Sequence, residues 1–174
     1  MNGNILIAYF SRPGENYVNG KIERLSVGNT QIVAEKAASL TGGRLFRIEP
    51  ENPYSPLYAQ CVKQARADMQ SNARPALKTD LPEAEAYDAL ILCYPNYCGA
   101  MPMPVWTFLE AHSFSGARIF PVCTHEGSGM GRSEEDLAKL CPHAQILAGL
   151  AVRGCEAQAS DEAIERRLKE AGFI

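Results

Sequence analysis

Three short segments carry the residue types that could bind a ligand, and the first is suited to an anion. Ser11 ends the apolar run Ile5–Phe10, and Gly28, Asn29 and Thr30 stand at the start of an apolar pattern with helical spacing. The first N–H groups of a helix lack intrahelical partners and carry the positive end of its dipole. The segment therefore predicts a phosphate site, although a turn that only caps the helix fits it equally well.

The other two segments follow two further apolar runs. The run Ala89–Tyr94 ends in Pro95, Asn96, Tyr97, Cys98 and Gly99. The run Arg118–Cys123 ends in a glycine-rich stretch that begins with Thr124, His125, Glu126 and Gly127. This stretch does not match the dinucleotide motif G-x-G-x-x-G, because Arg132 occupies the last glycine position. His125 and Glu126 are interpreted as a solvated loop pair, and Cys98 as a passive loop cysteine.

The elements that must position these segments alternate between strand and helix patterns. We expect strands at Ile5–Phe10, 45–48, Ala89–Tyr94, Arg118–Cys123 and 146–152, and helices beginning near residues 29, 58, 103, 133 and 160. Such alternation favours an α/β fold with a doubly wound parallel sheet and helices on both faces. Ligands bind to such sheets beyond the carboxyl ends of the strands, so the three segments should meet there.

Several local expectations accompany this fold. The segment from Arg12 to Val27 is expected to be an irregular surface loop, since its P-loop-like glycines, Gly14 and Gly20, have the wrong spacing. Pro121 should mark a strand end or an irregularity. Ser133 and Asp136 resemble a capping box. The helical stripe of Tyr58, Val62, Ala65 and Met69 is interpreted as core and not as cofactor contact.

Composition limits the function further. The 174 residues are 46% hydrophobic and 21% charged, which is typical of one globular domain spanning residues 1–174. A net charge of -3 without a basic run argues against nucleic-acid binding. Six scattered cysteines indicate a reducing compartment, and no apolar stretch is long enough to span a membrane. The first strand begins directly after Asn4, which leaves no space for a signal peptide, so we expect a cytoplasmic protein.

Taken in order, the segments resemble a known family over almost the whole chain. The strand end at Ser11, the triplet 28–30, the segment 94–99 and Cys123-Thr124 together resemble the flavodoxins. Within that family, the chain is most similar to a branch with a split phosphate loop and a Gly-Ser-Gly-x-Gly segment, here residues 127–131. The resemblance implies a flavodoxin-like, five-stranded parallel sheet in the order 2-1-3-4-5, with FMN as the cofactor.

The resemblance also implies roles for the three segments. Phosphate would be held by Ser11, Arg12, Gly28, Asn29 and Thr30. The flavin ring would lie beside the loop of Pro95, Asn96, Tyr97, Cys98 and Gly99, with Tyr97 as the stacking wall. The site would also include Thr124, His125, Glu126 and Gly127. In proteins of this kind, a peptide after the third strand rotates when the flavin is reduced, and the Cys98–Gly99 peptide is the candidate because glycine permits positive φ.

The function that follows is an FMN-binding electron-transfer protein, with no catalytic residue assigned. Its partner would be a redox protein or a small-molecule electron donor or acceptor, with neither nucleic acid nor membrane involved. The alternative is an FMN-dependent NAD(P)H:quinone-type oxidoreductase, because electron-shuttle flavodoxins tend to be more acidic than this chain. A phosphoryl-receiving domain of the same winding is set aside, since Phe10-Ser11 and Tyr94-Pro95 stand where acidic residues would be needed.

Overall fold

The computed structural model describes residues 4–81 and 87–174. Its central sheet has the strand order β4-β1-β5-β6-β7, with β8 also paired to β6, and every pairing is parallel. The strands are β1 (Ile5–Tyr9), β4 (Arg44–Arg47), β5 (Ala89–Pro95), β6 (Arg118–His125), β7 (Gln145–Ile146) and β8 (Leu150–Arg153). Numbered along the chain, these strand positions run 2-1-3-4-5, which confirms the predicted order.

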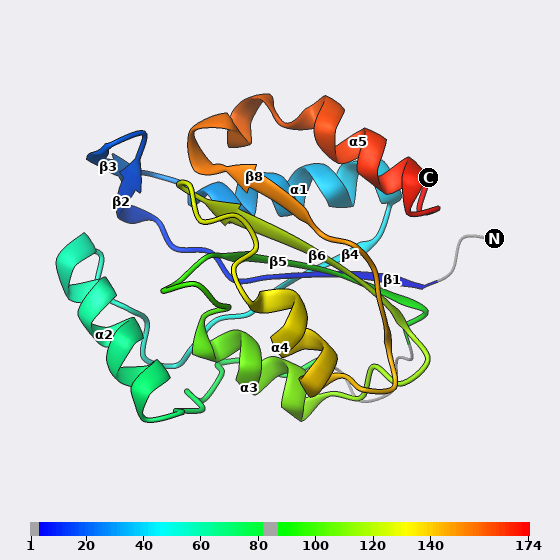
Figure 1. Cartoon of the computed structure of the whole chain (residues 1–174), viewed down its shortest axis with the longest axis horizontal. Helices are drawn as coiled ribbons and strands as arrows, with labels where there is room; N and C mark the ends of the chain where they lie inside the picture. The colour runs from blue at the N-terminus through cyan, green and yellow to red at the C-terminus, as the bar shows by residue number, and fades with distance from the viewer. Residues whose placement is uncertain (1–3, 82–86) are drawn as a thin grey trace.

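Helices cover both faces of the sheet. Figure 1 shows α1 and α5 on one face and α3 and α4 on the other. The helices are α1 (Asn29–Thr41), α2 (Tyr58–Gln70), α3 (Met103–Ala111), α4 (Ser133–Leu140) and α5 (Asp161–Glu170), with a 3₁₀-helix η1 (Gly154–Ala159) before α5. The predicted α/β fold is therefore confirmed, and η1 is an addition that the sequence analysis did not anticipate.

The alternation of side chains along the strands explains the two layers. In β1, Leu6 and Ala8 pack in the same buried cluster as Phe108 of α3. Ile7 points to the other face and packs in the cluster that contains Val33 of α1. Successive strand residues face opposite sides, so a strand that is apolar throughout is covered on both. The sheet is thereby packed between two helical layers, which hold the carboxyl ends of its strands in place.

Pro121 coincides with an irregularity, as predicted. It lies in the middle of β6, where the neighbouring strand is interrupted between β7 and β8. The carbonyl of Ile119 accepts a hydrogen bond from Leu147 N–H at 2.8 Å, so Pro121, two residues on, faces the same neighbour. Proline has no N–H to continue this ladder. The expected single strand 146–152 therefore forms as two short strands.

The expectation of an irregular loop between Arg12 and Val27 is wrong. This segment contains an antiparallel hairpin of β2 (Gly14–Val18) and β3 (Lys21–Leu25), which is a separate two-stranded sheet. The two residues at its tip both have positive φ, 49° at Asn19 and 88° at Gly20. A two-residue type I′ turn requires this, and Asn-Gly is its preferred sequence. The glycine spacing that imitates a P-loop thus belongs to a hairpin turn.

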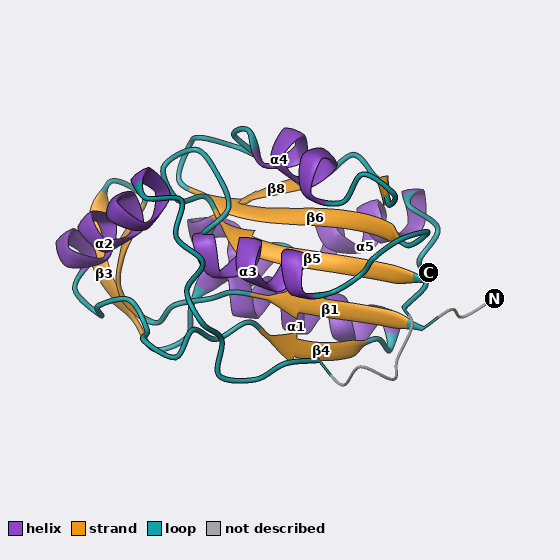
Figure 2. Cartoon of the chain, turned by 90° about the horizontal axis from the view of Figure 1, so that it is seen from below, coloured by secondary structure: helices purple, strands orange, loops and turns teal. Residues whose placement is uncertain are grey.

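Helix α2 is bound to this hairpin. The N–H of Glu15 donates to the carbonyl of Pro56 at 2.7 Å, and the N–H of Tyr58 donates to Glu15 Oε2 at 3.0 Å. The rings of Tyr17 and Tyr58 stack with centroids 6.1 Å apart. Figures 1 and 2 both show the hairpin and α2 together, beyond the carboxyl ends of the sheet strands. They therefore form a wall opposite that edge.

The capping-box prediction at α4 is also wrong. The N-cap residue of α4 is Arg132, and the Ser133 side chain makes no cap hydrogen bond. Instead, Ser133 Oγ donates to the carbonyl of Met130 at 2.6 Å and accepts the hydroxyl hydrogen bond of Tyr94 at 2.8 Å. Asp136 pairs with Arg132 at 3.2 Å. Ser133 thus fixes the glycine-rich loop onto β5.

Within residues 4–81 and 87–174, no helix is long and apolar enough to cross a membrane. The first three residues, on which the expectation of a chain without a signal peptide depends, lie outside the described part.

Candidate functional site

A cavity of about 380 Å³ lies at the carboxyl ends of β1, β5 and β6. One side is formed by the three predicted segments, and the other by the hairpin and α2. Its lining comprises Ser11, Arg12, Asn16, Tyr17, Asn29, Thr30, Tyr58, Cys61, Val62, Ala65, Arg66, Pro95, Asn96, Tyr97, Cys98, Thr124, His125, Glu126, Ser128 and Gly154. This volume is in the range of small-molecule sites.

The N-terminus of α1 forms one end of the cavity and has the geometry to bind an anion. The N-cap residue of this helix, Gly28, has no side chain to cap it, and the first turn contains no acidic residue. Gly28 allows the helix to begin against the end of β1, because a Cβ there would lie 2.2 Å from Ser11 Oγ and 2.8 Å from the carbonyl oxygen of Arg12. Ser11 Oγ accepts the N–H of Gln31 at 3.1 Å. Asn29 and Thr30, as the first two helical residues, have no intrahelical acceptors for their N–H groups.

A buried hydroxyl pair joins this end to the third segment. Thr30 Oγ1 and Thr124 Oγ1 are 2.7 Å apart, and both residues are buried. One hydroxyl donates to the other, which leaves the second proton for a ligand. The pair therefore holds α1 and β6 together while keeping one donor for the cavity.

Arg12 has its guanidinium turned toward the hairpin. Its Nη1 donates to the carbonyls of Ser55 at 3.0 Å and Pro13 at 3.3 Å, and its Nη2 donates to that of Glu15. Its buried Nε has no partner among the described residues. Arg12 therefore lines the cavity and fixes the base of the hairpin, and its predicted role as a phosphate ligand remains a prediction.

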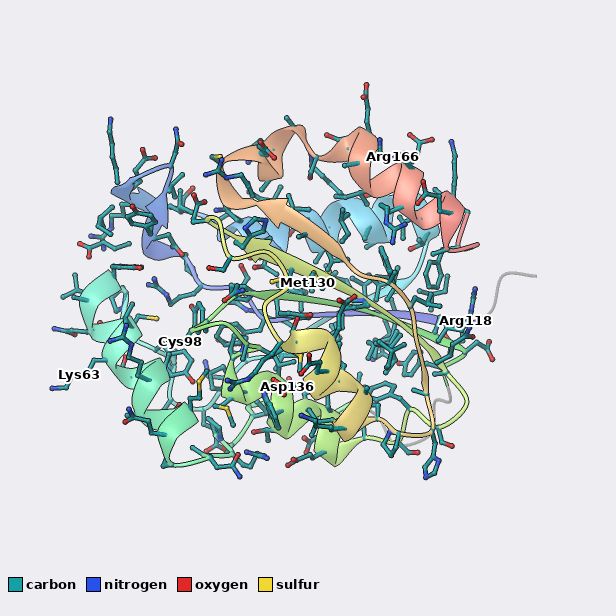
Figure 3. The ribbon with its side chains drawn as sticks, viewed as in Figure 1. Lys63, Cys98, Arg118, Met130, Asp136 and Arg166 are labelled. Atoms are coloured by element: carbon teal, nitrogen blue, oxygen red, sulfur yellow. The ribbon has the colours of Figure 1, made fainter. Side chains whose placement is uncertain are left out.

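The second segment forms a tight turn. Tyr97 N–H donates to the Ala100 carbonyl at 2.9 Å, and Ala100 N–H donates back to the Tyr97 carbonyl at 3.1 Å. Between them, Cys98 has a φ of 53° and Gly99 a φ of 82°. Figure 3 shows Cys98 at this edge, between α2 and α4. The turn thus places an exposed thiol and a left-handed backbone beside the cavity.

Asn96 holds this turn in place with its side-chain amide. Its Oδ1 accepts the N–H of Gly99 at 2.9 Å, and its Nδ2 donates to the carbonyl of Gly129 at 2.9 Å. The N–H of Arg132 donates to the carbonyl of Gly99 at 2.9 Å. The glycine-rich loop therefore fits closely against the turn, and a Cβ on Gly131 would lie 2.2 Å from the Gly99 carbonyl oxygen.

Tyr97 forms a rigid aromatic wall. Its ring lies edge-on to Phe10, with centroids 5.9 Å apart, and 6.1 Å from the ring of Tyr54. Its hydroxyl accepts a hydrogen bond from Cys61 Sγ at 3.7 Å. Burial raises the pKa of Tyr97, so the phenol is neutral at physiological pH. Stacking of this ring on a ligand remains a prediction.

His125 and Glu126 do not form a solvated loop pair. His125 Nδ1 accepts the N–H of Gly127 at 2.9 Å. Glu126 Oε2 instead accepts the N–H of Asn19, at the tip of the hairpin, at 2.9 Å. Each side chain thus has a separate partner, and Glu126 connects the third segment to the opposite wall.

The structure brings most of the predicted site residues into the cavity lining. Gly28, Gly99 and Gly127 are outside the lining, although Gly28 sets the approach of α1. The assignment of the α2 stripe to the core is wrong for Tyr58 and Val62, which are only partly buried and line the cavity. Ala65 is buried, as predicted, and it also borders the cavity. The Asn19-Gly20 turn signal could have revealed the hairpin wall. Gly154 also lines the cavity, and no sequence pattern indicates this.

The described residues contain no group of three or more His, Cys, Asp or Glu side chains that could hold a metal ion.

Comparison with known proteins identifies similar folds. The family model described as flavodoxin matches residues 4–166. A candidate flavoprotein from Bacteroides eggerthii DSM 20697 is 27% identical, with a TM-score of 0.77 and 97% of each chain covered. A flavoprotein in complex with FMN from Lactobacillus acidophilus NCFM is 17% identical, with a TM-score of 0.63, covering 92% of this chain and 99% of the other. A search of curated proteins found no match.

The burial of the six cysteines predicts which thiols react. All six cysteines are free, and only Cys98 and Cys155 are exposed. Burial raises the pKa of Cys123 to about 12 and that of Cys141 to about 11, and it also raises the pKa values of Cys61 and Cys93. At pH 8 these four thiols stay protonated, so a disulfide reagent should modify two thiols per folded chain rapidly and the remainder only after unfolding.

The Cys98→Ser variant should reduce the rapid count from two to one. Rapid modification of four or more thiols in the folded chain at pH 8 would contradict this assignment.

Proposed function

The chain belongs to the flavodoxin family, and from this premise we propose that it binds FMN in the cavity and transfers electrons through it. The observation that carries the proposal is the meeting in one cavity of a helix N-terminus that begins at Gly28, without an acidic residue in its first turn, and an aromatic, glycine-containing turn. The first suits a phosphate, and the second suits a flat conjugated ring. The L. acidophilus flavoprotein, which has the same fold, is in complex with FMN.

At the phosphate end, the residues fit the group without rearrangement of the backbone. Asn29 and Thr30 present N–H groups at the positive end of α1. Ser11 lies against Gly28 at the end of β1, and the buried Thr30–Thr124 pair retains one hydroxyl proton. These donors can neutralise and orient a phosphate in a site that Gly28 keeps open.

At the other end, the residues offer an apolar and aromatic enclosure for the ring. Tyr97 is held by Phe10 and Tyr54, and Tyr58 and Val62 of α2 line the same cavity. Aromatic faces and aliphatic side chains favour a planar conjugated ligand. The α2 wall also excludes water from part of the cavity.

When bound, FMN supplies the one- and two-electron chemistry, and the protein sets its binding and its potential. The chain's own contribution is the Cys98–Gly99 peptide, whose N–H is turned toward Asn96 Oδ1. Rotation of this peptide would break that bond and present the Cys98 carbonyl in its place. Asn96 therefore opposes the rotation, and Gly99 permits it.

The partner that we propose is a redox protein or a small-molecule electron donor or acceptor, with no role for nucleic acid or membrane. The net charge of -3 gives weak electrostatic steering toward a basic partner. A second candidate function is an FMN-dependent NAD(P)H:quinone-type oxidoreductase. The hairpin and α2 favour it, because Asn16, Tyr17 and Tyr58 line the same cavity as the three segments and so form a second wall against which a small substrate could bind.

The cofactor and its phosphate site can be tested together by visible absorption. We expect the purified chain to retain a bound, oxidised flavin spectrum after FMN is added and the excess is removed. Asn29→Ala and Thr30→Ala should each weaken FMN binding by about tenfold or more, because each removes a polar group at the helix start. Ser39→Ala, at the exposed far end of α1, is the matched control. Failure of the unmodified chain to retain flavin would refute the proposal.

The role of the turn can be tested by potentiometry. Gly99→Ala should shift the midpoint potentials of bound FMN by tens of millivolts, because Ala is strained at a φ of 82° and a tenfold change corresponds to 59 mV for one electron. No described atom lies within 4 Å of the added Cβ, so a clash does not explain the shift. Gly116→Ala, at a φ of 80° and equally open, is the control. Unchanged potentials in Gly99→Ala would rule out a redox role for this peptide.

Steady-state oxidation of NADH and NADPH separates the two functions. An electron carrier should show no turnover with a quinone acceptor until a separate reductase is added. Sustained turnover by the FMN-loaded chain alone would instead establish the oxidoreductase.

A further inference from the structure

Glu126 has one carboxylate oxygen with a partner and one without. Its Oε2 accepts the N–H of Asn19 at 2.9 Å. Its Oε1 is buried, and no hydrogen bond reaches it from the part of the chain that the structure describes. A buried polar atom without a partner is costly, and it is rare in native proteins unless a ligand or ordered water serves it. The unpaired oxygen therefore indicates a missing donor.

The place of this oxygen narrows the choice of donor. A Cβ on Gly154 would lie 2.4 Å from Glu126 Oε1 and 2.5 Å from Asn29 Nδ2, so both of these side-chain atoms lie directly beside Gly154. All three residues line the cavity, beside the first turn of α1. A carboxylate repels a phosphate, so the phosphate itself is excluded as the partner, and a hydroxyl or N–H of the same ligand, beside the phosphate at the start of α1, fits this position.

The paired oxygen fixes the hairpin. Val18 and Lys21 form the last pair of the β2–β3 ladder, so the N–H of Asn19 lies outside it and points to Glu126. At its base, the hairpin is fixed by Glu15, whose side chain accepts the N–H of Tyr58. The bond from Asn19 to Glu126 therefore closes the cavity at the end away from α2.

We propose that Glu126 binds a ribityl hydroxyl of FMN through Oε1 and, through Oε2 of the same carboxylate, holds the hairpin closed over the cavity. This inference rests on the proposed function. The ribityl chain carries the hydroxyl donors that adjoin the phosphate of FMN, which α1 places beside Asn29. A bound hydroxyl fixes the orientation of the carboxylate and so favours its bond to Asn19. By linkage, a closed hairpin favours the ligand to the same extent.

Binding of three flavins can distinguish contacts to the phosphate, to the ribityl chain and to the ring. FMN has the phosphate and the ribityl chain, riboflavin lacks the phosphate, and lumiflavin lacks both. Glu126→Ala should weaken FMN and riboflavin binding by similar factors of about 10–100, the range for a hydrogen bond to a charged group. It should weaken lumiflavin binding by a smaller factor, because lumiflavin loses only the closed hairpin. Thr30→Ala should weaken FMN binding alone. The binding constants are measured by flavin fluorescence.

Trypsin reports on the hairpin, because Lys21 and Arg24 lie in β3. Riboflavin should slow cleavage at these residues in the unmodified chain and have no such effect in Glu126→Ala. Glu126→Gln, which keeps the shape and one acceptor, should lose less affinity than Glu126→Ala. Glu23→Ala removes an exposed hairpin carboxylate and should retain both the affinity and the protection.

The outcomes separate this inference from the proposed function. Absence of flavin binding by the unmodified chain would overturn both. Flavin binding that is unchanged in Glu126→Ala, or ligand protection of Lys21 and Arg24 that persists in that variant, would overturn the inference alone.

Discussion

The close approach of the α1 N-terminus to the end of β1 is the constraint on which the site depends. It exists because Gly28 has no Cβ, which would lie 2.2 Å from Ser11 Oγ. The approach brings the positive end of α1 to the carboxyl edge of the sheet, and the buried Thr30–Thr124 bond then fixes it to β6. The cavity therefore lies against α1 and β6, and the helix end that suits an anion is already in position without a ligand.

The opposite wall has a different physical origin. The hairpin and α2 contribute little to the two main clusters of the core, and a few specific contacts hold them to each other and to the site: the Tyr17–Tyr58 stack, the Glu15 bonds and the Asn19–Glu126 bond. Segments with few buried apolar contacts open at low free-energy cost. The site thus combines a rigid floor with a wall whose position depends on individual hydrogen bonds.

The alternation of strands and helices and the meeting of the three segments could be predicted because apolar strands and their polar ends are local patterns. The strand order was implied by the resemblance to flavodoxins, since local patterns do not show which strands are neighbours. The hairpin could also have been predicted, since Asn19-Gly20 is a strong turn signal. The error at α2 has a different cause: a stripe such as Tyr58, Val62 and Ala65 indicates that one face is covered, but not whether core or ligand covers it. The resemblance to flavodoxins implied that Glu126 belongs to the site, but its bond to Asn19 could not be predicted, because Asn19 lies 107 positions away on a wall that was not anticipated.

The wall also bears on how electrons would enter and leave. An electron carrier that docks on other proteins needs its flavin ring near an open surface. A hairpin closed over the cavity would leave the edge at the Cys98 turn as the place where electrons are exchanged. That turn is held by Asn96, which also binds the glycine-rich loop through Gly129. Any change in the peptide at Gly99 must therefore be accommodated by this loop, where Gly131 leaves no space for a side chain. The exposed edge thus coincides with the peptide that we propose to respond to flavin reduction, so a partner docking there would contact that peptide.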